Sequence, residues 1–170
     1  MPFTPFHMGP AAVCKAVAGD RFSFTVFGYS QILIDIEPLI RLVRADPALH
    51  RPSRSYAGAL VIGLFAIATG KWACETGIRL WNNLFTWSWL QLRGTIAWPV
   101  VVGSAFLGTF SHVVLDSLLH ADMRPLQPFS DARPLLGLLS HTAVLELCVW
   151  SGALGGLAWL LVCAARRVLA

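Results

Sequence analysis

Long apolar runs separated by short polar segments constrain this fold more than any other feature of the sequence. The hydrocarbon core of a bilayer is about 30 Å thick, and a helix that rises about 1.5 Å per residue crosses it with about 20 apolar residues. Four runs come close to this length, namely Phe22–Val43, Ala57–Ala73, Ala97–Leu119 and Ala143–Ala165. The sequence therefore predicts an all-α fold: a polytopic membrane helical bundle of about four transmembrane helices, built as a single domain over residues 1–170.

The composition agrees with a membrane protein. Hydrophobic residues make up 56% of the chain and charged residues 13%, with a mean hydropathy of +0.63, whereas soluble domains are about one quarter charged. The net charge of +4 comes from scattered Arg and Lys rather than from a basic run, so we expect membrane lipids and no nucleic acid as partners. The four cysteines are far apart and show no C-x-x-C spacing, which favours buried thiols over disulfides.

Two segments are predicted to lie at the membrane without crossing it. Met8–Gly19 is too short to span a bilayer and is expected to form a re-entrant or interfacial helix. Glu75–Gly94 mixes tryptophans with polar side chains, a pattern typical of an interfacial helix at the level of the headgroups. Within Phe22–Val43, Pro38 is expected to bend or break the helix.

A polar stripe ends the third apolar run. His112, Asp116 and His120 are spaced four residues apart, and such positions lie almost above one another on a helix. Imidazole and carboxylate are ligand types that zinc and similar divalent ions take. The stripe therefore predicts a metal site or a proton-handling site. The alternative is a helix end whose polar side chains simply reach the boundary between membrane and water.

Carboxylates inside the first predicted span are a second candidate feature. A carboxylate at bilayer depth costs several kcal/mol unless it is paired, protonated or facing an aqueous cavity. Asp35 and Glu37 are two residues apart and point to nearly opposite sides of a helix, so only one of them can easily face a shared site. We favour Asp35 for that site. The alternative is an ion pair between Asp35 and Arg41 or Arg44.

The predicted topology brings many of these groups to one membrane face. With four crossings, the polar loops Leu42–Tyr56 and His120–Thr142 share a face with the end of the third span. That face gathers His50, His112, Asp116, His120 and His141, and Asp35 approaches it from within the first helix. His7 joins them only if the N-terminal segment does not cross. Arg51, Arg54 and Arg124 on the same face are candidates for holding a phosphate by paired hydrogen bonds.

Several short segments carry a resemblance to a known family. They are Met1–His7, Ile34–Glu37 with its Asp-x-Glu pattern, Ser111–Asp122 with Ser-His-x-x-x-Asp-x-x-x-His, and Leu138–His141. In these segments the chain resembles the bacterial family of membrane-bound metal-dependent hydrolases. The resemblance implies a multi-pass protein of the bacterial inner membrane. It also implies a hydrolytic site that depends on bound metal.

The order of the candidate ligands is also similar to that of zinc-dependent phospholipase C, an all-helical phosphodiesterase. This resemblance implies a ligand set of His7, Asp35, His50, His112, Asp116, His120 and His141, holding one to three divalent ions with zinc expected first. Asp116 would be a candidate bridge between ions. Two departures from the resemblance are visible: Glu146 follows His141 by five residues rather than four, and the segment His50–Tyr56 lacks the second histidine of the membrane family's His-Arg-x-x-Thr-His-Ser motif.

The chemistry that follows from such a site is metal-assisted hydrolysis of a phosphate ester, for which a lipid is the natural substrate at headgroup level. Asp35 and Asp116 are the candidate catalytic carboxylates, with Asp35 either a ligand or the base that deprotonates the attacking water. Glu37 and Glu146 are secondary candidates for the site. Two alternatives stay open: a metal-ion or proton transporter, and a non-catalytic membrane scaffold. The sequence leaves the oligomeric state open.

Overall fold

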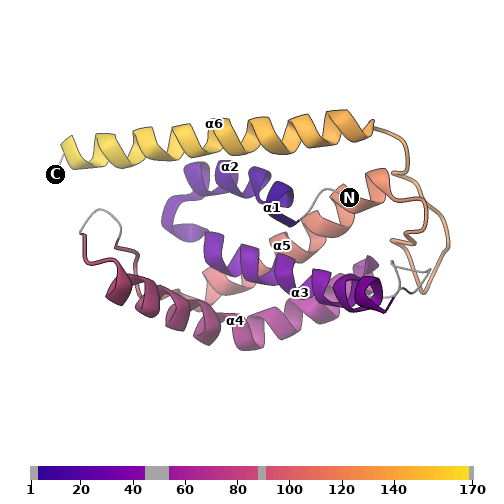
Figure 1. Cartoon of the computed structure of the whole chain (residues 1–170), viewed down its shortest axis with the longest axis horizontal. Coiled ribbons are helices and arrows are strands. Elements are labelled where there is room, and N and C mark those ends of the chain that lie inside the picture. Colours follow the sequence, from indigo (N-terminus) through magenta and orange to yellow (C-terminus); the bar gives the residue numbers. More distant parts are fainter. Residues whose placement is uncertain (1–3, 45–53, 88–90, 169–170) are drawn as a thin grey trace.

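The computed structural model describes residues 4–44, 54–87 and 91–168, and all regular structure in these ranges is helical (Figure 1). The elements are α1 (Thr4–His7), α2 (Gly9–Ala18), the 3-10 helix η1 (Gly19–Arg21), α3 (Phe24–Val43), α4 (Tyr56–Leu84), α5 (Trp98–Leu119) and α6 (His141–Val168). The prediction of an all-helical membrane bundle is confirmed.

Three helices in the described part of the chain are long and apolar enough to cross a membrane: α4, α5 and the His141–Ala165 part of α6. The first predicted span, Phe22–Val43, coincides with α3, which is 20 residues long. It is not among these three candidate spans, and three charged residues, Asp35, Glu37 and Arg41, lie within it. Pro38 lies inside α3, and the helix continues past it to Val43, so the residue does not break the helix.

The helices alternate in direction, so that one end of the bundle gathers separate parts of the chain (Figure 1). The ends of α3 and α5 and the starts of α4 and α6 lie at this end, on the right of the view. α3, α4 and α5 pack against one another, while α6 packs mainly against α2. The arrangement agrees with the predicted topology, in which both polar loops belong to the same side.

α4 is longer than the sequence suggested. It begins at the N-cap Ser55, whose hydroxyl accepts a hydrogen bond from the Gly58 N–H at 3.0 Å, and it continues without interruption to Leu84. The prediction of a separate interfacial helix at Glu75–Gly94 is therefore wrong, because the first ten residues of this segment belong to α4. Asn82 exchanges hydrogen bonds of 2.8 and 2.9 Å with the backbone of Leu92, which satisfies its amide within the protein.

The N-terminal segment enters the bundle and turns back. α2 has 10 residues and is about 15 Å long, half of what a crossing needs. It packs closely along α6: a Cβ built on Gly9 would lie 1.8 Å from the carbonyl oxygen of Cys148. Between η1 and α3, the Ser23 N–H donates to the Ser104 hydroxyl of α5 at 2.9 Å. The prediction of a short helix that does not span the bundle is confirmed, and the His7 side chain just before it is buried.

The contact between α3 and α5 depends on a missing side chain. A Cβ built on Gly108 would lie 2.0 Å from the Ser30 hydroxyl and 2.9 Å from the carbonyl oxygen of Phe27, closer than real atoms approach. Small residues of this kind let the backbones of membrane helices come close together. The close approach also places the Gly108 carbonyl within hydrogen-bonding reach of α3.

We therefore expect Gly108→Ala to lower the free energy of unfolding by about 1–3 kcal/mol, because the new methyl group over-packs the contact between α3 and α5. Chemical unfolding of the detergent-solubilised protein measures this. Gly103→Ala is the matched control, since a Cβ at Gly103 of the same helix meets nothing within 4 Å. Equal stabilities of the two variants would contradict the proposed close packing.

Candidate metal centre

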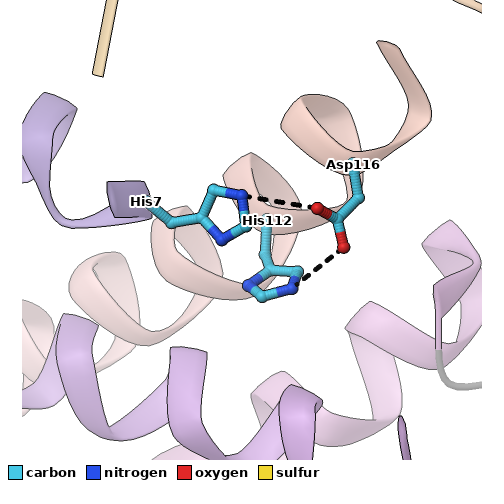
Figure 2. Close-up of side chains that lie close together, drawn as sticks. All are labelled: His7, His112 and Asp116. Carbon is cyan, nitrogen blue, oxygen red and sulfur yellow. Dashed lines mark ion pairs between the residues drawn. The ribbon is translucent and has the colours of Figure 1, made fainter. Parts of the chain in front are cut away.

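His7, His112 and Asp116 form a buried group of potential ligands (Figure 2). His7 ends α1, and the other two residues lie one turn apart on α5. His7 Nε2 is 3.3 Å from Asp116 Oδ1, and His112 Nε2 is 3.2 Å from Asp116 Oδ2. The three side chains are at most 2% exposed. Their ligand atoms all lie within 4.8 Å of one another, so one metal ion could be held by all three.

The imidazole nitrogens of His7 and His112 lie at ion-pair distance from carboxylate oxygens but do not form hydrogen bonds of good geometry with them. His7 Nδ1, His7 Nε2 and His112 Nε2 are buried without a hydrogen-bond partner in the described part of the chain. Leaving buried polar atoms unpartnered is costly. Ligand atoms of a tetrahedral zinc site, each about 2.0–2.1 Å from the ion, are roughly 3.3 Å apart. The 3.2 and 3.3 Å separations, which reach the two different oxygens of Asp116, are close to that spacing, and the donor types are ones that zinc takes.

Gln31 of α3 orients one of the imidazoles. Its amide Nε2 donates to the Gly108 carbonyl at 3.1 Å, so its Oε1 faces His112 Nδ1, with which it forms a short hydrogen bond. Because a carboxamide oxygen only accepts, Nδ1 carries the proton, and in the neutral imidazole Nε2 is then the nitrogen that can bind an ion. This is the arrangement that a second-sphere partner gives to a metal-binding histidine.

Asp35 and Arg54 lie against the same group. Asp35 Oδ1 is 3.2 Å from His112 Nε2. The Arg54 guanidinium donates from Nη1 to Asp116 Oδ2 and from Nη2 to Asp35 Oδ1. Its side chain is 4% exposed, and that of Asp35 is 23% exposed. Asp35 therefore forms the part of the site that water can reach, and its arginine partner here is Arg54, where the sequence offered Arg41 or Arg44.

The other predicted histidines lie at the edge of the group or away from it. His120 Nε2 is 3.9 Å from Asp116 Oδ1, and the His120 side chain is partly exposed. His141 begins α6 with an exposed side chain and does not belong to the ligand group formed by the described residues. His50 lies outside the described residues, as does Arg51.

The remaining charged candidates are placed away from the buried group. Arg124 Nε lies 3.8 Å from Asp131 Oδ1, and Arg124 Nη1 donates to the Ala121 carbonyl, so this arginine is part of the loop between α5 and α6. Glu37 is half-buried beside a groove between α3 and α4. Glu146 is exposed on α6. Of the two arginine candidates in the described residues, Arg54 contacts the ligand group and Arg124 contacts its own loop.

Gln31 is the member of the site that sequence reasoning missed. A signal for it was present, because Gln31 stands four residues before Asp35 and so shares its helix face. A single amide in an apolar helix on the face of a candidate ligand is a reason to look for a hydrogen bond to that ligand or its neighbour.

Comparisons of the chain with protein-family models, with curated proteins and with solved structures give no significant match. The resemblance to membrane-bound metal-dependent hydrolases therefore remains a prediction. The chemical assignment of the centre depends on the contacts described above.

We expect Gln31→Leu to lower the affinity for zinc about 10–100-fold, because His112 loses the hydrogen bond that fixes its tautomer and ring orientation. Isothermal titration calorimetry of the purified protein measures the affinity. His112→Ala should abolish binding at this group, and His141→Ala, which changes an exposed histidine, should leave it unchanged. An unaltered affinity in Gln31→Leu would rule out the orienting role.

Proposed function

We propose that the protein is a membrane-embedded, zinc-dependent hydrolase that cleaves a phosphate ester. The observation that carries this proposal is the buried group of His7, His112 and Asp116, with imidazole nitrogens that lack hydrogen-bond partners and a second carboxylate next to them. Buried, perturbed groups of this kind concentrate at functional sites. On the basis of the sequence resemblance, we place the protein in a bacterial inner membrane.

Each residue of the centre has a role in this proposal. His7, His112 and Asp116 would hold the ion, with Gln31 orienting His112. When bound, a divalent ion would lower the pKa of a water molecule toward neutrality and neutralise charge on a phosphoryl oxygen. Asp35 is the most exposed carboxylate of the site and lies 3.2 Å from His112 Nε2, so it is placed to hold the attacking water and to accept its proton. Arg54 positions both carboxylates.

A groove beside the centre supports a lipid as the substrate. It has a volume of about 840 Å³ and lies between the start of α4 and the loop at residues 127–131. Ser55 lines the groove and directly follows Arg54 in the chain. Most of the exposed lining is apolar. A mostly apolar groove that begins one residue after Arg54 suits the acyl chain of a lipid whose phosphate ester reaches the centre.

The packing next to the centre favours a hydrolase over a transporter. Transport would need a polar path from the centre toward the other end of the bundle. Polar side chains do follow α3 and α5 in that direction, but Ser30 and Thr109 donate to the carbonyl oxygens of Phe27 and Phe106 on their own helices. The backbones also approach too closely at Gly108 to leave room for even a Cβ. This seam is therefore closed to ions.

The test is hydrolysis by the purified protein in phospholipid vesicles, with a chromogenic phosphodiester as a second substrate. We expect turnover that a chelator removes and added zinc restores. Asp35→Asn should retain zinc and lose about 10²–10⁴-fold in turnover, as for removal of a general base. His112→Ala should lose both zinc and turnover, and His141→Ala should keep both.

Two results would contradict the proposal. A zinc-loaded protein with no more turnover than His112→Ala on either substrate would indicate a non-catalytic scaffold. Loss of zinc in Asp35→Asn would make Asp35 a ligand rather than the base.

A further inference from the structure

The two oxygens of Asp116 face different sets of partners. Oδ1 lies 3.3 Å from His7 Nε2 and 3.9 Å from His120 Nε2. Oδ2 accepts a hydrogen bond from Arg54 Nη1 and lies 3.2 Å from His112 Nε2. Asp116 therefore bridges the candidate ion-binding group and a guanidinium, much as a carboxylate can bridge two metal ions.

Arg54 occupies the space between the two carboxylates of the centre. Its Nη2 donates to Asp35 Oδ1 while its Nη1 donates to Asp116 Oδ2, so one planar cation is held by two side chains from different helices. The segment that carries it is fixed on both sides of the helix start: Ser55 caps α4, and the Tyr56 N–H donates to the Pro125 carbonyl at 2.8 Å. These contacts hold the Arg54 side chain in a defined position within the centre.

The charges of the centre limit how many ions it can hold. Asp35 and Asp116 contribute two negative charges, and Arg54, which stays protonated in proteins, contributes one positive charge. One divalent ion would bring the sum to +1, and a second would bring it to +3. Excess charge of one sign in a buried site is strongly unfavourable, so the residues present match a single ion.

We propose that Arg54 takes the place of a second metal ion, so that the centre is mononuclear and the guanidinium is its permanent second cation. This inference rests on the metal centre of the proposed function. It narrows the range of one to three ions that the ligand order implies. It also gives Arg54 the role of a positioning residue: the guanidinium, rather than a second bound ion, holds Asp35 and Asp116 in place.

The first test is the zinc content of the wild-type protein, measured by elemental analysis after removal of excess metal and combined with X-ray absorption spectroscopy. We expect one zinc per chain and no metal–metal signal at about 3.5–4 Å, the separation found in two-metal sites. Two ions per chain, or a metal–metal signal in this range, would overturn the proposal. A wild-type protein without zinc would overturn the metal centre itself, so the two failures are distinguishable.

The second test exchanges the cation. Arg54→His removes one positive charge and places an imidazole between Asp35 and Asp116, so we expect about two zinc ions per chain and a metal–metal signal. Arg54→Lys keeps the charge and should stay at one ion. Arg124→His makes the same exchange in the loop, outside the centre, and should also stay at one. An Arg54→His protein that melts like the wild type but holds one ion would overturn the proposal, and the wild-type measurement decides it if this variant does not fold.

Discussion

The structure depends on how the carboxylate of Asp116 is accommodated within a membrane helix. On insertion scales an aspartate at the centre of a spanning helix costs about 3 kcal/mol. Asp116 lies in the last turn of α5, where this cost is smaller, but its side chain is only 2% exposed. The compensating contacts come from separate segments: Arg54 from before α4, His7 from α1 and His112 from α5 itself. The buried carboxylate is compensated only when these three segments come together. Its burial therefore links the N-terminal segment, the start of α4 and the end of α5.

The same constraint explains the unusual path of the N-terminal segment. If α2 crossed the membrane, His7 would lie on the other side of the bundle from Asp116. Instead α2 is short, packs along α6 and returns through η1 to α3. α3 then contributes both Asp35 and Gln31, which contact His112 from one helix face. The described ligand group comes from α1 and α5 alone. The polar side chains that contact it come from α3 and from Arg54.

Much of this fold could be predicted from the sequence because its signals are local. Apolar runs of about 20 residues indicate membrane helices, and the four-residue spacing of His112 and Asp116 indicates a shared helix face. The proximity of His7 to this pair required knowing that α2 turns back, which its length suggested. The role of Arg54 could not be predicted, because a loop residue has no periodicity and its partners lie 19 and 62 positions away.

The errors have physical causes that can be identified. Glu75–Gly94 resembles an interfacial helix because its polar residues look exposed in the sequence. In the structure, Glu75 accepts hydrogen bonds from Lys71 Nζ at 2.5 Å and from the Ile96 N–H at 2.9 Å, so α4 can continue through this region. The sequence groups His141 with the other histidines because the predicted topology assigns them to one membrane face. A shared side does not bring an exposed residue at the start of α6 into contact with a group buried between α1 and α5.

The most direct test of the central claim is an anomalous difference map at the zinc edge, from crystals of the protein loaded with zinc. The account predicts one strong peak about 2.0–2.2 Å from His7 Nε2, His112 Nε2 and an oxygen of Asp116. A peak at another position, with these three side chains unligated, would contradict it, and so would the absence of any peak at this group.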